Sequence, residues 1–205
     1  MKEGEELFLF RHGMTLANEE NRYCGRTDLP LSKKGKESLI EKREKRERAG
    51  GYPDISRCRI YTSGLKRATQ SLGLLYPECA KFATEEKAFQ ELNFGDFEMK
   101  SYAELKEDFF YKIWVQGEVD RIQGIAKENP CPNGESWLQM ENRVIFALEN
   151  ILKNDRSVAI FTHGGVISAI MRHFFPNERK SIYEWQPDFG EGYKITIGRG
   201  YERIP

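Results

Sequence analysis

The 205-residue sequence carries 32 lysine and arginine residues and 32 aspartate and glutamate residues, so its formal net charge is zero. This balance argues against a general nucleic-acid binder, and no run approaches the roughly 18 consecutive apolar residues that a membrane helix needs. A chain of this length that is 39% hydrophobic and 12% aromatic can bury a core without disulfides or metals, so we expect a soluble, cytoplasmic protein.

The first predicted strand is the apolar run at residues 7–10, a pattern typical of a strand that is covered on both faces. Arg11 and His12 follow it directly, so polar groups stand where a central strand would reach solvent. Residues 33–48 predict an exposed helix with charge pairs at i,i+4 spacing, which ends at residues 50–53, Gly-Gly-Tyr-Pro.

The middle of the chain continues the alternation of strands and helices. Residues 59–62 predict a second strand, and residues 65–75 predict a helix with one apolar stripe that stops before a proline. Another short strand is expected within residues 82–92, followed by a helix over roughly 101–116. The polar segment 117–134 contains glycine and proline and predicts a surface loop.

The last part of the chain opens with an amphipathic helix over residues 135–151. Residues 157–161 predict a buried parallel strand, and residues 166–175 predict another helix. A final strand is expected at residues 193–197, at an edge of the sheet. Since no repeat or linker interrupts the pattern, we predict a single domain over residues 1–205.

This order of elements predicts an α/β fold, a three-layer α/β/α sandwich with a mainly parallel central sheet. In such sheets ligands bind beyond the carboxyl ends of the strands. Three predicted strands would therefore deliver their following residues to one edge: Arg11 with His12, Arg67, and His163 with Gly164.

These side chains together suit a phosphoryl group. Two guanidinium groups, Arg11 and Arg67, can neutralise and orient its oxygens. A neutral imidazole facing the phosphorus is a competent nucleophile, and a second, protonated imidazole would stabilise the negative charge of the transition state. His12 and His163 are the candidates for these roles. With this many cations supplied by the protein, the chemistry requires no Mg²⁺.

The cysteines give no sign of a metal or redox site. They stand at positions 24, 58, 79 and 131, too far apart for a Cys-x-x-Cys motif, so free thiols are expected. A Cys-x5-Arg phosphatase loop, a His-Glu-x-x-His zinc helix, a Gly-x4-Gly-Lys-Ser/Thr phosphate loop and a Gly-x-Ser-x-Gly elbow are absent. The sequence therefore predicts no metal site and no cofactor.

The sequence resembles the histidine phosphatase (phosphoglycerate mutase-like) superfamily over most of its length. Residues 9–15 resemble the Arg-His-Gly signature, and residues 22–32 resemble the loop that follows it. Residues 63–68 resemble the segment with the second arginine of the family, residues 91–98 the segment with its acid, and residues 162–165 the second-histidine motif. The resemblance implies the fold of that superfamily.

The same resemblance implies roles for individual residues. His12 would be the nucleophile that accepts the phosphoryl group, and Arg11, Arg67 and His163 would clamp the phosphate. Asn18 would add a hydrogen bond. The resemblance places three more residues at the substrate: Cys24, Gly25 and Gly164.

Glu91 would donate a proton to the leaving alcohol, whose alkoxide is otherwise a poor leaving group. Glu85, Glu86 and Glu98 are nearby alternatives for this acid. One departure is Met99, where many phosphatases of the family have glycine, and it could alter the shape of the substrate entrance.

Other residues have simpler expected roles. We expect His173, in an apolar helix, to be packed in the interior. The aromatic residues between 109 and 114 either line a substrate lid or pack their helix: Phe109, Phe110, Tyr111 and Trp114.

Several functions remain open at this stage. The loop at 22–31, with residues 132–136, is similar to α-ribazole-phosphate phosphatases, which favours a phosphatase of a small phosphorylated metabolite, with α-ribazole 5'-phosphate as one candidate. A cofactor-dependent phosphoglycerate mutase and a catalytically inactive binding module of the same fold are the alternatives. As partners we expect a small-molecule phosphate ester, no nucleic acid, no membrane and a possible homodimer.

Overall fold

A computed structural model describes residues 3–50, 53–123, 125, 129–153 and 157–205. Within them, six strands form one mixed sheet in the order β3-β2-β4-β1-β5-β6. The strands are β1 (Glu6–Arg11), β2 (Arg59–Thr62), β3 (Thr84–Glu85), β4 (Val158–Thr162), β5 (Gly192–Thr196) and β6 (Gly200–Ile204). β1, β4, β2 and β3 run parallel to one another, whereas β5 and β6 are antiparallel to their neighbours. The predicted α/β fold with a mainly parallel sheet is confirmed.

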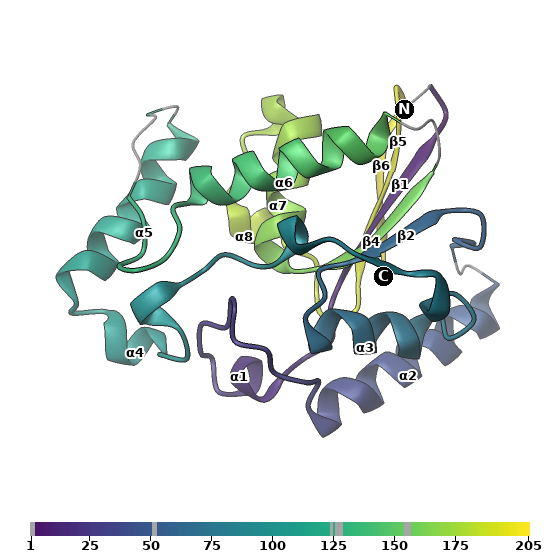
Figure 1. The fold of residues 1–205 in the computed structure, drawn as a ribbon, viewed down its shortest axis with the longest axis horizontal. Coiled ribbons are helices and arrows are strands. Elements are labelled where there is room, and N and C mark those ends of the chain that lie inside the picture. The colour runs from purple at the N-terminus through teal and green to yellow at the C-terminus, as the bar shows by residue number, and fades with distance from the viewer. Residues whose placement is uncertain (1–2, 51–52, 124, 126–128, 154–156) are drawn as a thin grey trace.

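Helices cover both faces of this sheet (Figure 1). α2 and α3 lie on one side, and α6, α7 and α8 lie on the other. The α-helices in the described residues are α1 (Leu16–Glu19), α2 (Lys33–Ala49), α3 (Lys66–Leu75), α4 (Tyr102–Leu105), α5 (Phe109–Ile122), α6 (Trp137–Leu152), α7 (Gly164–Phe174) and α8 (Ile182–Trp185). Short 3₁₀ turns occur at Ala80–Phe82, Lys87–Phe89, Gly95–Phe97 and Pro176–Glu178.

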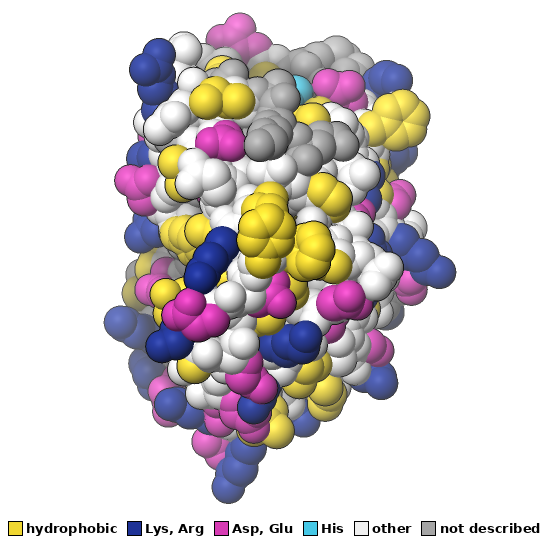
Figure 2. Space-filling model, turned by 90° about the vertical axis from the view of Figure 1, so that its left-hand side faces the viewer, with side chains coloured by type: hydrophobic (Ala, Val, Ile, Leu, Met, Phe, Trp, Pro, Cys, Tyr) yellow, Lys and Arg dark blue, Asp and Glu magenta, His cyan; other side chains and the backbone are white. Residues whose placement is uncertain are grey.

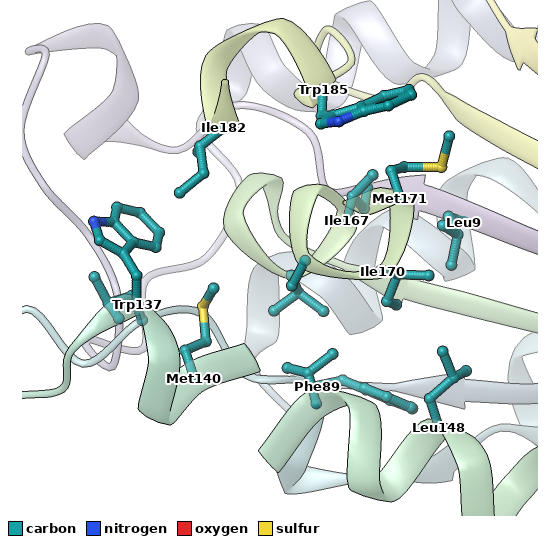
Figure 3. Packing of buried hydrophobic residues seen from close by; sticks show 14 of the residues in the cluster. Leu9, Phe89, Trp137, Met140, Leu148, Ile167, Ile170, Met171, Ile182 and Trp185 are labelled. Atoms are coloured by element: carbon teal, nitrogen blue, oxygen red, sulfur yellow. The ribbon is translucent and has the colours of Figure 1, made fainter. Parts of the chain in front are cut away.

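The middle of β1, residues 7–10, is apolar at every position. Successive side chains of a strand point to opposite faces, and here both faces are covered. Leu7 and Leu9 pack into the cluster formed with α6, α7 and α8, while Phe8 and Phe10 pack into the cluster formed with α2 and α3. Figure 3 shows Leu9 among the side chains of the first cluster. Burial on both faces fixes β1 in the middle of the sheet.

The segment after residue 100 differs from the prediction. The single helix expected over 101–116 is two helices, α4 and α5, and α5 continues to Ile122, into the segment predicted to be a loop. Tyr111, Trp114 and Glu118 are buried, at spacings of three and four that place them on the inner face of α5. The buried Glu118 is paired with Arg172, a partner from α7 that local composition does not reveal. Residues 124 and 126–128 of the predicted loop lie outside the described residues, as do residues 51–52 at the end of the predicted first helix.

Two further predictions were wrong. The strand at 193–197 is not at the edge, because β6 pairs with β5 through a turn at Gly198, whose φ of 79° favours glycine. His173 is exposed rather than packed in the interior, and its Nε2 lies 3.9 Å from Glu149 on α6. The prediction failed because His173 lies on the outer side of an otherwise buried helix.

The face formed by α4 and α5 carries exposed apolar side chains, gathered in the middle of the view in Figure 2. Phe109, Phe110, Val115 and Val119 are among the exposed large apolar residues of this region. Among the described residues, none of the helices has the length and apolar character to cross a bilayer. The cytoplasmic location and the homodimer stay predictions.

Candidate active site

The carboxyl ends of three neighbouring strands bring the sequence motifs together. Arg11 ends β1, Ser63 follows β2, and His163 follows β4, which lies between β1 and β2. The backbone N–H of His12 donates to the carbonyl of Thr162 over 2.9 Å, so the hydrogen-bond pattern continues one residue past the strands. The ring centres of His12 and His163 lie 5.0 Å apart. His12 and His163, which are 151 positions apart in the sequence, are therefore neighbours at one edge of the sheet.

His12 is held in one tautomer. Its Nδ1 lies 2.6 Å from the carbonyl oxygen of Gly13, which can only accept a hydrogen bond, so Nδ1 carries the proton. The Nε2 atom consequently keeps its lone pair. Burial, followed by the positive charges of Arg67 and Arg11, lowers the pKa of His12 well below its usual value. The ring is thus a neutral imidazole whose unprotonated nitrogen is available as a nucleophile.

Arg67 is fully buried behind the cavity wall and organises the loop that follows α1. Its guanidinium donates to the carbonyl oxygens of Gly25 (2.7 Å) and Thr27 (2.8 Å), and more weakly to that of Cys24 (3.4 Å). Gly25 is needed here, since an added Cβ would lie 1.8 Å from the carbonyl oxygen of Leu92. The expected clamp arginine is therefore also the anchor of the loop that carries Cys24 and Gly25.

His163 corrects one expectation. Its Nδ1 lies 3.2 Å from Nε of Arg67, a group that only donates, so Nδ1 is unprotonated. Its Nε2 then donates to the hydroxyl of Ser63 over 2.8 Å. Burial, followed by the charge of Arg67, lowers the pKa of His163 well below its usual value. The second imidazole is neutral in this arrangement, whereas the sequence predicted a protonated imidazole that stabilises the transition state of a phosphoryl group.

Arg11 lies at the floor of the cavity with much of its guanidinium committed to one loop. Its Nη1 donates to the carbonyl of Pro187 over 2.8 Å, and its guanidinium carbon lies 4.1 Å from the ring centre of Phe189. Burial lowers the pKa of Arg11, while Glu91 and Asp188 act in the opposite direction. The Nε atom is buried without a protein partner among the described residues. Arg11 is a cation held in a fixed orientation beside His12.

Glu91 is the carboxylate that faces this cavity. One carboxylate oxygen accepts from the backbone N–H of Gly165 (3.0 Å) at the start of α7, and the other accepts from that of Leu92 (2.9 Å). Arg143 of α6 donates to the carbonyl of Glu91 over 3.0 Å and forms an ion pair with Glu135 at 2.7 Å. Arg143, which the sequence analysis missed, therefore fixes the backbone that carries Glu91.

The three alternative carboxylates lie elsewhere. Glu98 accepts hydrogen bonds from the backbone of Gly25 and Arg26 and from the Thr27 hydroxyl, so it holds the loop in place. Glu86 accepts from the N–H of Ala88 at the start of a 3₁₀ turn. Glu85 is exposed and packs against Gly64. Of the four carboxylates, Glu91 is the one that lines the cavity.

The cavity has a volume of about 150 Å³. Its lining includes site residues that the sequence predicted and others that it did not. Asn18 lines it, and its Oδ1 accepts from the N–H and hydroxyl of Thr15, which leaves its amide nitrogen as a donor. Gly164, Gly25, Arg67 and His163 do not line it and lie in or behind its wall. The full lining is Arg11, His12, Asn18, Arg22, Tyr23, Cys24, Glu91, Phe94, Trp114, Trp137, Gly165, Tyr183 and Gln186. Tyr183 and Gln186 come from a segment without any motif, and the sequence carried no signal for them. Trp137 lies in the predicted amphipathic helix over 135–151, but no role at the site was predicted for it.

A larger cavity of about 410 Å³ lies between α6, α7 and α8. Its charged residues are largely paired: Arg172 with Glu118 and Glu141, and Lys180 with Glu178. The imidazole in its lining, His173, lies 3.9 Å from Glu149. The smaller cavity instead brings Arg11, His12 and Glu91 of the sequence motifs together, so it is the candidate active site. No three His, Cys, Asp or Glu side chains of the described residues group in a way that could hold a metal ion.

The backbone at Met99 has a conformation that favours glycine. Its φ is 61°, in the left-handed region, while its N–H donates to Tyr23 over 2.7 Å and its carbonyl accepts from Arg22 over 2.8 Å. A Cβ in this conformation costs about 1 kcal/mol. We therefore expect Met99→Gly to be about 1 kcal/mol more stable than Met99→Ala, measured by urea unfolding. If the glycine variant were the less stable of the two, as at ordinary positions, the strained backbone would be refuted.

Because His12 and His163 are buried and have lowered pKa values, the free energy of unfolding should decrease in acid. An unfolded histidine takes up its proton near pH 6.5, whereas His12 and His163 do so at lower pH when folded. The unfolded state therefore binds more protons as the pH falls below about 6.5, and each histidine removes up to about 1.4 kcal/mol of stability per pH unit. The stabilisation is fully present above that pH. The urea midpoint should fall between about pH 7.5 and 5.5, and it should fall less steeply with pH in His163→Asn than in the wild type. The same pH dependence in both proteins would contradict this prediction.

Comparisons with known proteins agree with this geometry. The profile of the histidine phosphatase superfamily (branch 1) matches residues 7–204. The chain is 24% identical over 186 residues to a 2,3-bisphosphoglycerate-dependent phosphoglycerate mutase of Tropheryma whipplei (strain Twist), with 82% of each chain covered. It is 29% identical over 182 residues to phosphoglycerate mutase-like protein 4 of Arabidopsis thaliana, covering 85% of this chain and 73% of that one.

A solved structure has the same fold. It is that of an Escherichia coli K-12 protein that is proposed to be an α-ribazole-5'-phosphate phosphatase, and it superposes with a TM-score of 0.79. The match covers 98% of this chain and 94% of that chain at 20% identity.

Proposed function

This chain belongs to the histidine phosphatase superfamily (branch 1), and from that premise we propose that it hydrolyses phosphate monoesters through a covalent phosphohistidine at His12. The observation that carries the proposal is the tautomer of His12. Its Nδ1–H is held by the carbonyl of Gly13 at 2.6 Å, and burial beside Arg67 and Arg11 lowers its pKa. Nε2 is therefore an unprotonated nucleophile beside two cations that suit a phosphoryl group.

In the first step, the lone pair of His12 Nε2 attacks phosphorus while the ester P–O bond breaks. Glu91 gives its proton to the leaving oxygen, so the product is a neutral alcohol and not an alkoxide. Arg11 and Arg67 stabilise the charge on the nonbridging oxygens, and the amide nitrogen of Asn18 donates to one of them. His163 contributes through Arg67, its hydrogen-bond partner, and the charge of a bound phosphate would raise the pKa of this imidazole.

In the second step, water hydrolyses the phosphohistidine. The Glu91 carboxylate takes a proton from the water as its oxygen attacks phosphorus, and the N–P bond breaks with its electron pair returning to Nε2 of His12. Inorganic phosphate leaves, and both groups have regained their starting protonation. The arginines supply the positive charge in both steps, so we propose that the activity is metal-independent.

The experiment that tests the proposal measures phosphate release from a panel of phosphate esters in the presence of a metal chelator. α-Ribazole 5'-phosphate belongs in this panel, because the structural neighbour from Escherichia coli is proposed to act on it. Release of phosphate that depends on His12 supports the proposal. A lack of turnover and of phosphoenzyme over the whole panel would favour the inactive binding module instead.

Phosphoglycerate mutase activity is the second candidate, favoured by the relative from Tropheryma whipplei, whose name states that activity. A mutase would use the same phosphohistidine but return the phosphoryl group to an alcohol and not to water. The two are separated by product analysis with 3-phosphoglycerate and 2,3-bisphosphoglycerate. Formation of 2-phosphoglycerate faster than inorganic phosphate would identify a mutase.

A further inference from the structure

Aromatic side chains form one part of the wall of the candidate active site, beside its charged and polar residues. Five lining residues carry such rings: Tyr23, Phe94, Trp114, Trp137 and Tyr183. Four of them, all but Tyr183, are packed on one another, with Trp114 and Trp137 stacked at 5.5 Å and Tyr23 at 5.1 Å from Phe94. This wall is therefore assembled before any ligand arrives, and its surface matches a flat apolar group.

The rings come from separate parts of the fold. Trp114 lies on α5, Trp137 is the first residue of α6, and Tyr183 lies on α8. In Figure 3 the Trp137 side chain points away from α6, toward the segment that carries Ile182. The cavity volume of about 150 Å³ is comparable to that of an engineered apolar cavity, ~150 Å³, that takes up benzene. Because His12 and Arg11 line the same cavity, a single small ring is the largest group that this space could take beside the phosphoryl group.

The charges near these rings do not suit a second anion. Arg11 and Arg22 are the arginines that line the cavity, which has no lysine in its lining among the described residues. The Nε of Arg22 donates to Glu20 (2.7 Å), and its Nη1 donates to Glu104 (2.9 Å). Two carboxylates thus face one guanidinium, and Arg22 offers no net positive charge to a carboxylate or second phosphate of a substrate.

We propose that the alcohol released by this enzyme is uncharged and carries an aromatic ring, which stacks against the wall formed by Trp114, Trp137 and Tyr183. The proposal rests on the phosphatase activity proposed above and names its substrate class. Tyr183 is the specificity-determining residue, since it lines the cavity with a side chain that is 66% exposed and that a bound ring would cover. The paired Arg22 disfavours alcohols that carry a second anionic group.

Three primary alkyl phosphates test the proposal with leaving groups of similar chemistry: 2-phenylethyl phosphate, n-propyl phosphate and 3-phosphoglycerate. Burying the phenyl ring should raise kcat/KM for the first by about tenfold or more over n-propyl phosphate. 3-Phosphoglycerate should be the slowest of the three. Equal kcat/KM values for the ring-bearing and propyl esters would overturn the ring site.

Two variants assign the effect to residues. Tyr183→Ala should reduce, several-fold, the ratio of kcat/KM for the phenyl ester to kcat/KM for n-propyl phosphate. Phe146→Ala is the matched control, because Phe146 is also an exposed aromatic residue (71%) but lies on α6 and does not line the cavity. The double change Glu20→Gln and Glu104→Gln should release Arg22 and raise kcat/KM for 3-phosphoglycerate alone. If Tyr183→Ala kept the wild-type ratio of kcat/KM for the phenyl and propyl esters, the role of Tyr183 would be refuted.

Binding of non-hydrolysable phosphonates separates this inference from the proposed function. We expect 3-phenylpropylphosphonate to bind about tenfold or more tightly than n-propylphosphonate by calorimetry. If this preference is found but no ester is hydrolysed, the ring site stands and the phosphatase proposal fails. If esters are hydrolysed but the two phosphonates bind equally, the phosphatase proposal stands and the ring site is overturned.

Discussion

Replacing His12 with alanine should lower kcat/KM for phosphate-ester hydrolysis by about 10⁴-fold or more, the size of effect that removal of a covalent nucleophile produces. The other imidazole at this edge of the sheet, His163, cannot take over, because its Nδ1 and Nε2 are occupied by Arg67 and Ser63. Binding of a phosphate ester should persist, since Arg11 and Arg67 remain. The loss should therefore fall on kcat more than on KM.

The phosphoenzyme gives an independent readout of the same change. Wild-type protein quenched during turnover of a ³²P-labelled ester should carry acid-labile, base-stable label, as expected of a phosphohistidine, and His12→Ala should carry none. His173→Ala is the matched control, because this histidine is exposed on the outer side of α7 and should retain both label and activity. Turnover within tenfold of wild type in His12→Ala would exclude the covalent mechanism.

The sequence predicted the strand ends well because the physical signal there is local and strong. An apolar run buried on both faces, followed at once by Arg11 and His12, has few other interpretations in an α/β sheet. The same signal marks β4 and His163. The strand order then follows from the parallel pairing of β4 with both β1 and β2, which brings the motifs together.

The cavity wall could not be predicted in this way, because its residues depend on tertiary contacts. Trp114 is an exception, since it lies in the helix predicted over 101–116 and was named as a residue that lines a lid or packs that helix; it is buried and also lines the cavity. The continuation of α5 to Ile122 was missed, because it depends on the pairing of Glu118 with Arg172 of α7. Tyr183 and Gln186 belong to a short segment after α7 without periodicity or motif. The protonation state of His163 was missed for a related reason. It depends on which of its nitrogens faces Arg67, and spacing along the chain carries no information on that.

The leaving group decides how strongly the replacement of Glu91 by glutamine affects the reaction. For an alkyl ester, loss of the general acid should lower kcat/KM by about 10²–10⁴-fold. For p-nitrophenyl phosphate, whose leaving group departs as a stable anion, kcat/KM should fall by less than about tenfold, because the first step then needs no proton. Glutamine retains an oxygen that can accept from Gly165 or Leu92, so the geometry around the site should be preserved.

The second step supplies a further test of Glu91→Gln. Without a carboxylate to accept a proton from water, the phosphohistidine should be hydrolysed slowly, so a burst of p-nitrophenol equal to the enzyme concentration should precede a slow steady state. The control is Glu85→Gln, the same chemical change at an exposed carboxylate outside the cavity, which should give wild-type rates with both esters. Equal losses of kcat/KM for alkyl and aryl esters in Glu91→Gln would mean that Glu91 does not protonate the leaving oxygen. The carboxylate would then act on substrate binding or on the charge of Arg11, which it faces across the cavity floor.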